Sequence, residues 1–138
     1  MRRFTLAALV TLVVMALVAP AAFAGSPHFV NDILITRDGN SLTVSGKEAG
    51  LGSETQVHIV VTADAQCINP GSHHPKAANK ESFSAEGDFP VQNGKAEFSL
   101  TLTATFQPDC SPPMTVVFTN VTVSDVEHGV TKSFPGTF

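Results

Sequence analysis

Strict alternation of apolar and polar residues marks the clearest β-strand of the chain, over residues 96–106. Successive side chains of a strand point to opposite faces, so a period of two indicates a strand with one buried face. The same alternation runs over residues 55–65. The apolar positions of the two segments are Phe98, Leu100, Leu102, Ala104 and Phe106, and Val57, Ile59, Val61 and Ala63. We therefore expect the two apolar faces to pack together in one core.

A third long strand is expected over residues 114–126, where the alternation changes phase. Val116 and Phe118 share one face, whereas Val121 and Val123 fall on the other. One extra residue in a strand turns all later side chains to the opposite face. The change near Asn120 therefore predicts a β-bulge, with burial on both faces as the alternative.

Shorter strands complete the predicted fold, over residues 30–36, 41–45, 81–85 and 130–134. Turn residues separate the strands at Asp38-Gly39-Asn40, Gln92-Asn93-Gly94 and His128-Gly129. Gly46, Gly50 and Gly52 are expected to break the connection that follows residue 45. Seven short strands without a helical pattern are typical of an all-β fold. We predict a seven-stranded antiparallel immunoglobulin-like sandwich, with a small barrel as the alternative.

The first 24 residues are predicted to be a secretory signal peptide. Arg2 and Arg3 precede a short apolar run, and Ala22-Phe23-Ala24 forms a small-residue cleavage site. Cleavage after Ala24 would release residues 25–138 as a single secreted, extracellular domain. The apolar run is short for a membrane span, so we expect no stable membrane anchor, although an uncleaved anchor is the alternative.

The charge of the mature chain narrows the class of partner. Removing Arg2 and Arg3 from the 8 basic residues leaves 6 against 12 acidic residues, which gives a net charge of −6 with His neutral. Nucleic acids and anionic membranes attract Lys and Arg. We therefore expect a monomer that binds an extracellular protein or a small ligand and does not bind nucleic acid.

The two cysteines, Cys67 and Cys110, are predicted to form a disulfide, because exported proteins with an even cysteine count are usually oxidised. They follow the third and fifth predicted strands, whose loops share one end of a sandwich. The bridge should therefore join two loops, with Cα atoms within about 7 Å of each other.

The stretch after Cys67 is the candidate binding loop, because long irregular loops often carry function. Its polar residues are Ser72, His73, His74, Lys76, Asn79 and Lys80. The alternative is a crossover that serves only the disulfide. His73 and His74 could bind Zn or Cu if His28, His128 or Asp109 supplied a third donor, but no H-x-H or C-x-x-C spacing supports this hypothesis.

Catalysis is not expected. Both cysteines are assigned to the disulfide, no G-x-S-x-G motif is present, and His58 and Asp64 share one strand face but are too far apart to touch. Trp and Tyr, which usually line sugar-binding clefts, are absent. We expect neither an enzyme nor a bound cofactor.

Two resemblances add to this interpretation. The run from Cys67 to Lys80 and the segment Pro90-Val91-Gln92-Asn93-Gly94-Lys95 resemble small exported proteins of actinobacterial type that have no assigned function. The layout of Leu42-Thr43-Val44-Ser45-Gly46, Gly50-Leu51, Asn93-Gly94-Lys95-Ala96 and Ser99-Leu100-Thr101 is similar to neocarzinostatin-type apoproteins. That family implies a secreted seven-stranded sandwich that carries an apolar chromophore, but it has two short-loop disulfides where this chain has one long loop.

These observations together predict a secreted, non-catalytic immunoglobulin-like module for binding or structure. A carrier of a small apolar ligand is the first alternative, and a metal-binding protein that uses His73 and His74 is the second. An apolar cleft lined by Phe would favour the carrier.

Overall fold

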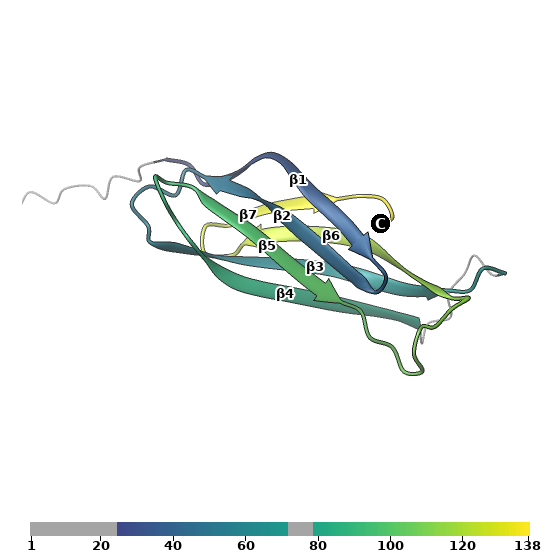
Figure 1. Ribbon diagram of the computed structural model, residues 1–138. Coiled ribbons are helices and arrows are strands. Elements are labelled where there is room, and N and C mark those ends of the chain that lie inside the picture. The colour runs from purple at the N-terminus through teal and green to yellow at the C-terminus, as the bar shows by residue number, and fades with distance from the viewer. Residues whose placement is uncertain (1–24, 72–78) are drawn as a thin grey trace, which may run out of the picture.

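The computed structural model describes residues 25–71 and 79–138, and the predicted signal peptide lies outside this part of the chain. The described residues form an all-β structure of seven strands. These are β1 (His28–Asp38), β2 (Ser41–Ala49), β3 (Gln56–Ile68), β4 (Lys80–Pro90), β5 (Ala96–Thr103), β6 (Thr115–Asp125) and β7 (Val130–Phe134). They pair antiparallel in two sheets, with orders β1-β2-β5 and β4-β3-β6-β7, which lie face to face (Figure 1).

The core lies between the two sheets and confirms the predicted packing of the alternating segments. The inward residues of β3 and β5 are all buried in one cluster with those of β2 and β6. Leu42, Val44, Val57, Ile59 and Phe118 are fully inaccessible to solvent. Aromatic rings meet edge to face, as Phe98 does with Phe29 at 5.8 Å and with Phe89 at 6.2 Å between centroids. The Phe rings therefore serve mainly as core.

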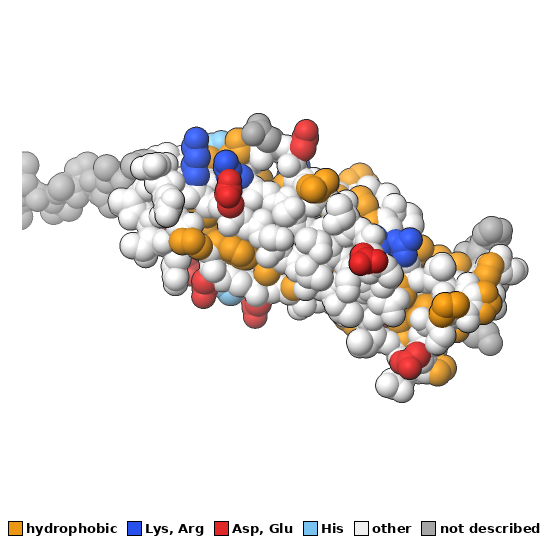
Figure 2. Space-filling view, viewed as in Figure 1, with side chains coloured by type: hydrophobic (Ala, Val, Ile, Leu, Met, Phe, Trp, Pro, Cys, Tyr) orange, Lys and Arg blue, Asp and Glu red, His pale blue; other side chains and the backbone are white. Residues whose placement is uncertain are grey.

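The outward face of the three-stranded sheet is covered by small hydroxyl side chains. Ser41 of β2 and Thr103 of β5 are paired across the strands with 2.9 Å between their oxygens, and Thr43 and Thr101 with 2.7 Å. Figure 2 shows uncharged side chains over most of the middle of the visible face. Alternation between this polar face and the core is what the period of two predicted.

The β-bulge predicted near Asn120 is confirmed. The pairing of β6 with β3 shifts by one residue between Thr62 and Asp64, and Asn120 takes a positive φ of 51°. Asn tolerates this left-handed conformation better than most residues. The bulge allows Val116 and Phe118, and then Val121 and Val123, to face the same core.

Gly46 corrects one expectation, because it lies inside β2 and does not end the strand. A Cβ atom at this position would come within 3.0 Å of Ile33 Cγ1 and 3.1 Å of Phe98 Cζ. Glycine is therefore present because side chains from the neighbouring strands occupy the space. Gly50 and Gly52 do lie in the following connection, both with positive φ.

Strand order gives the molecule two distinct ends, which are visible in Figure 1. The disulfide end carries the β1–β2 turn and the β3–β4 and β5–β6 connections. The opposite end carries the β2–β3 connection and the β4–β5 and β6–β7 turns. Beyond β7, Phe138 pairs with Phe118 of β6 through two backbone hydrogen bonds of 3.0 and 2.9 Å.

Candidate functional site

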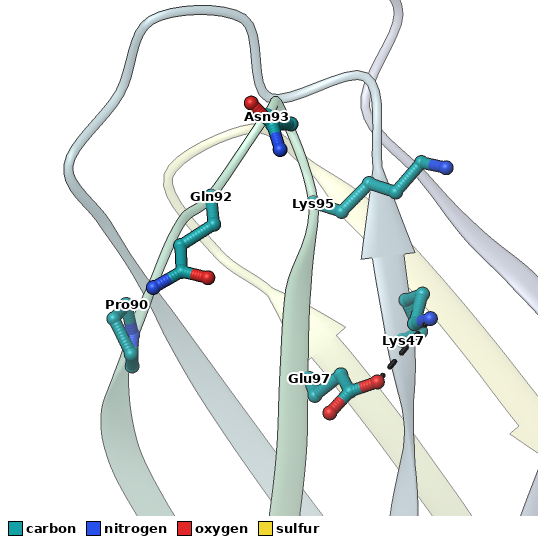
Figure 3. Close-up of a pocket in the computed structure, with 6 residues that line it drawn as sticks. All are labelled: Lys47, Pro90, Gln92, Asn93, Lys95 and Glu97. Atoms are coloured by element: carbon teal, nitrogen blue, oxygen red, sulfur yellow. Dashed lines mark ion pairs between the residues drawn. The ribbon is translucent and has the colours of Figure 1, made fainter.

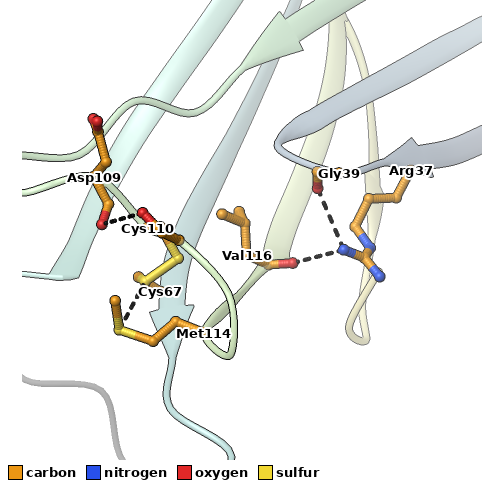
Figure 4. Close-up of a disulfide and its surroundings, with 8 residues drawn as sticks. Arg37, Gly39, Cys67, Asp109, Cys110, Met114 and Val116 are labelled. Atoms are coloured by element: carbon orange, nitrogen blue, oxygen red, sulfur yellow. Dashed lines mark hydrogen bonds between the residues drawn. A yellow bond between two sulfur atoms is a disulfide. The ribbon is translucent and has the colours of Figure 1, made fainter.

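The predicted disulfide is confirmed, with Cα atoms 5.7 Å apart (Figure 4). The expectation that it joins two loops is wrong for one partner. Cys67 lies within β3, opposite Val116 of β6, and is 3% exposed. Alternation continues past residue 65 and buries Cys67 as the next inward residue, whereas Cys110 lies in the β5–β6 connection. The bridge therefore fastens a connection to the core end of a central strand.

Two further contacts stiffen the disulfide end. Met114 Sδ lies 3.8 Å from Cys67 Sγ, a sulfur contact and not a hydrogen bond, because an oxidised cysteine has no S–H to donate. Arg37 donates from Nη1 to the carbonyl oxygens of Val116 at 3.0 Å and Gly39 at 3.3 Å (Figure 4). Because Arg37 is on β1 and Val116 on β6, this side chain links the two sheets.

The candidate binding loop lies mostly outside the described residues, which applies to Ser72, His73, His74 and Lys76. Asn79 is half-buried just before β4. Lys80 is exposed and opens β4, where it pairs with Gln66 of β3. The structure thus places the end of the loop on the outer face of the four-stranded sheet.

Lys80 lines a surface pocket of about 470 Å³ together with Asp64, Gln66, Glu81, Ser82 and Asn120. The Asp64 carboxylate is held there by the Asn120 amide at 2.8 Å and the Ser82 hydroxyl at 2.5 Å. These two hydrogen bonds lower the pKa of Asp64. The pocket is therefore lined by a hydrogen-bonded carboxylate and by an ammonium group, which suits a polar ligand.

Another polar pocket, of about 550 Å³, lies at the opposite end (Figure 3). Its lining residues are Lys47, Pro90, Gln92, Asn93, Lys95 and Glu97. Lys47 and Glu97 form an exposed ion pair across β2 and β5 with 3.2 Å between Nζ and Oε1. Such exposed pairs contribute little to stability. No Phe lines this pocket or the one beside Lys80, so neither is the apolar cleft expected of a carrier.

His58 lies between two acidic side chains on the outer face of the four-stranded sheet. Its Nδ1 is 2.7 Å from Asp88 and its Nε2 is 3.0 Å from Glu86, both on β4. The hydrogen bonds to Glu86 and Asp88 raise the pKa of His58. His58 and Asp64 belong to separate groups, in agreement with the expectation that they do not touch.

His128, at the end of the domain away from the disulfide, also lies between two acidic side chains. The sequence analysis did not predict this arrangement. Its Nδ1 is 2.5 Å from Asp125 and its Nε2 is 2.8 Å from Glu54. Desolvation acts to lower the pKa of His128, but the hydrogen bonds to Glu54 and Asp125 outweigh it and raise the pKa. The i, i+3 spacing of Asp125 and His128 was the available signal.

The described residues contain neither a metal-ligand cluster nor a membrane-spanning helix. Within it, no three His, Cys, Asp or Glu side chains are arranged to hold a metal ion. The same residues include no helix that is long and apolar enough to cross a membrane. The metal hypothesis for His73 and His74 concerns residues outside this part.

The cysteines and two of the described histidines are engaged in contacts within the domain. Both cysteines are oxidised and offer no thiolate, and the two described histidines with acidic neighbours have both ring nitrogens engaged.

Comparisons of the chain with protein-family models, with curated proteins and with solved structures each gave no significant match.

Proposed function

We propose that the chain is exported and acts outside the cell as a non-catalytic immunoglobulin-like binding or structural module. Seven antiparallel strands in sheets of three and four, around one core, support this class of fold. The fourth strand pairs with the third, whereas the fourth strand of an antibody constant domain joins the first sheet. Export is supported by the sequence of residues 1–24 and by the disulfide, which requires an oxidising compartment.

The observation that carries the proposal is the construction of the disulfide end. A covalent bridge and the Arg37 contacts hold both sheets and the β5–β6 connection at the end where residues 72–78 join β3 to β4. Binding residues are commonly presented by loops that a rigid scaffold positions. The proposed contact surface is therefore residues 72–78 together with Asn79 and Lys80.

Replacement of residues 72–78 by a Gly/Ser linker of equal length tests this surface. The change leaves Cys67 and the whole of β4 intact, so stability should be nearly unchanged. Partner capture from culture medium should be lost. Lys47→Ala with Lys95→Ala, at the opposite end, is the matched control and should retain capture. Equal capture by wild type and the linker variant would remove the disulfide end as the binding surface.

Native mass spectrometry of the secreted protein addresses the other hypotheses in the same preparation. A bound apolar molecule would favour the carrier, and stoichiometric Zn or Cu that shifts the NMR signals of His73 and His74 would favour the metal protein. The mass also reports export, because cleavage after Ala24 predicts a chain that begins at Gly25.

A further inference from the structure

Two carboxyl groups that interact with each other, Glu48 and Asp125, are buried at the end of the domain opposite the disulfide. Glu48, near the end of β2, and Asp125, at the end of β6, are each 0% exposed. β2 belongs to the three-stranded sheet and β6 to the four-stranded sheet. Two neighbouring carboxylates removed from water repel each other, and each is costly to ionise. The pair therefore requires an explanation that surface acids do not.

Asp125 has partners suited to an ionised group. Its Oδ1 accepts a hydrogen bond from the backbone N–H of His128 at 3.2 Å, and its Oδ2 lies 2.5 Å from the His128 ring. The other side of that ring contacts Glu54 in the β2–β3 connection. The His128 ring, which is half-buried, stands between the pair and Glu54. Asp125 is thus the member of the pair whose two oxygens both have hydrogen-bond partners.

Glu48 has no such partners, because neither carboxyl oxygen meets a hydrogen-bond donor. Its neighbours across the strands are Phe29 of β1 and Ala96 of β5, which carry no charge. A protonated Glu48 supplies its own donor, which Asp125 can accept. Burial is the largest cause that raises the pKa of Glu48, to about 8. The charge of Asp125, the hydrogen bond that a protonated Glu48 shares with it, and the charge of Glu54 raise the pKa further, whereas the charge of His128 lowers it.

We propose that Glu48 and Asp125 form a proton-binding site between the two sheets, flanked by His128 and Glu54, and that loss of the proton loosens this end of the domain. In the described ranges no three acidic or His side chains are placed to ligate a metal. A proton is accordingly the ligand that this geometry supports.

The direction of the pH dependence follows from linkage. A group with a raised pKa in the folded state contributes its full stability below its ordinary pKa, which is 4.5 for Glu48. That stability is lost as pH rises through the folded-state value. Between these two values the unfolded chain releases the proton while the folded chain keeps it, so the stability that the site contributes falls steadily from about pH 4.5 to about pH 8.

Urea unfolding of wild type and Glu48→Gln at about pH 6 and about pH 9 tests the site. The Gln amide is neutral at both pH values and donates to Asp125, so the unfolding constant of wild type should rise at least about tenfold more than that of the variant. Histidines that do not contact the site are present in both proteins and cancel in this ratio. Equal pH dependence would overturn the proposal.

Carboxyl ¹³C NMR of Glu-labelled wild type gives a second readout that does not require the variant to fold. One Glu resonance should titrate far above the ordinary range of about pH 4–5, and it should be absent from Glu48→Gln if that variant folds. A spectrum in which every Glu titrates in the ordinary range contradicts the proposal. The proposal is also contradicted if Ca²⁺ or Zn²⁺ at about pH 8 stabilises wild type, but not the variant, against urea unfolding. That result would assign the cluster to a cation.

Discussion

Removal of the disulfide should lower the stability of the domain by about 4 kcal/mol. The bridge joins residues that are 43 positions apart, and the chain-entropy relation gives roughly 4 kcal/mol at 25 °C for a loop of that length. This contribution is large beside a total of about 5–15 kcal/mol for a typical domain. Because Cys67 is 3% exposed, Cys67→Ala is a better test than Cys67→Ser, which would bury a hydroxyl group.

Urea unfolding should compare the two single alanine variants at Cys67 and Cys110 with the double variant, all under reducing conditions. Either single change already removes the whole cross-link, so each should lose nearly as much stability as the double variant. With an m-value of about 2 kcal/mol/M, the midpoint should fall by about 2 M. Ser111→Ala, in the same connection, is the control and should change stability by less than about 0.5 kcal/mol.

The entropic account makes a further claim about the unfolded state. Without the cross-link, the unfolded chain is less compact, so the m-value should rise as the midpoint falls. A loss below about 1 kcal/mol, or identical unfolding of oxidised and reduced wild type, would refute the reasoning. Losses that simply add between the two single variants would assign the effect to side-chain packing.

Two other sites give sharp expectations. Gly46→Ala should destabilise the domain by about 1–3 kcal/mol, because the added methyl group overpacks the core against Phe98; Gly39→Ala, with open space around its Cβ but a positive φ of 56°, should cost only about 1 kcal/mol in urea unfolding. His58→Gln should lower stability more at about pH 6 than at about pH 8, since a His with a raised pKa contributes fully below its ordinary value of 6.5 and loses that contribution as pH rises through the folded-state value. A His58 variant whose effect is independent of pH would contradict that cause.

The long strands and the core were predictable because their signal is local. Alternation over residues 55–65 and 96–106 states which side chains face inward, whatever the partner strand. The β-bulge at Asn120 was predictable for the same reason, because a bulge changes the alternation of side chains within a single strand. Strand β4 was harder to delimit because small and polar residues such as Ser84 and Gly87 occupy it, and their place in the sheet comes from pairing with β3.

The contacts of His58 depend on strand register and so were not predictable. His58 meets Glu86 and Asp88 only because β3 and β4 pair in one register, and no property of His58 alone specifies it. Gly46 was misread because glycine serves both turns and tight packing, and only the neighbouring strands distinguish the two. In both cases the role of the residue is set by a partner distant in sequence.

The burial of Glu48 was predictable from the period of two in β2, but its charged side chain favoured the opposite interpretation. Leu42, Val44 and Gly46 face inward, so the period of two places Glu48 on the buried face as well. Carboxylates are rarely buried without a partner, which favours the contrary interpretation that the strand ends earlier. The conflict between period and residue type was itself informative, because local rules are most often broken where a site requires it.

The two ends of the domain are stabilised by different physical means, and this separates their responses to conditions. The disulfide end is held by a covalent bond and by the hydrogen bonds that Arg37 donates to backbone carbonyl groups. The opposite end is held by carboxyl groups whose charge depends on pH. β2 runs from Ser41 to Ala49, and at about 3.3 Å per residue it separates the two ends by roughly 25 Å. Coulomb energy falls with distance, and a covalent bridge holds the disulfide end, so on the proposal above pH loosens one end while the proposed binding surface at the other keeps its geometry.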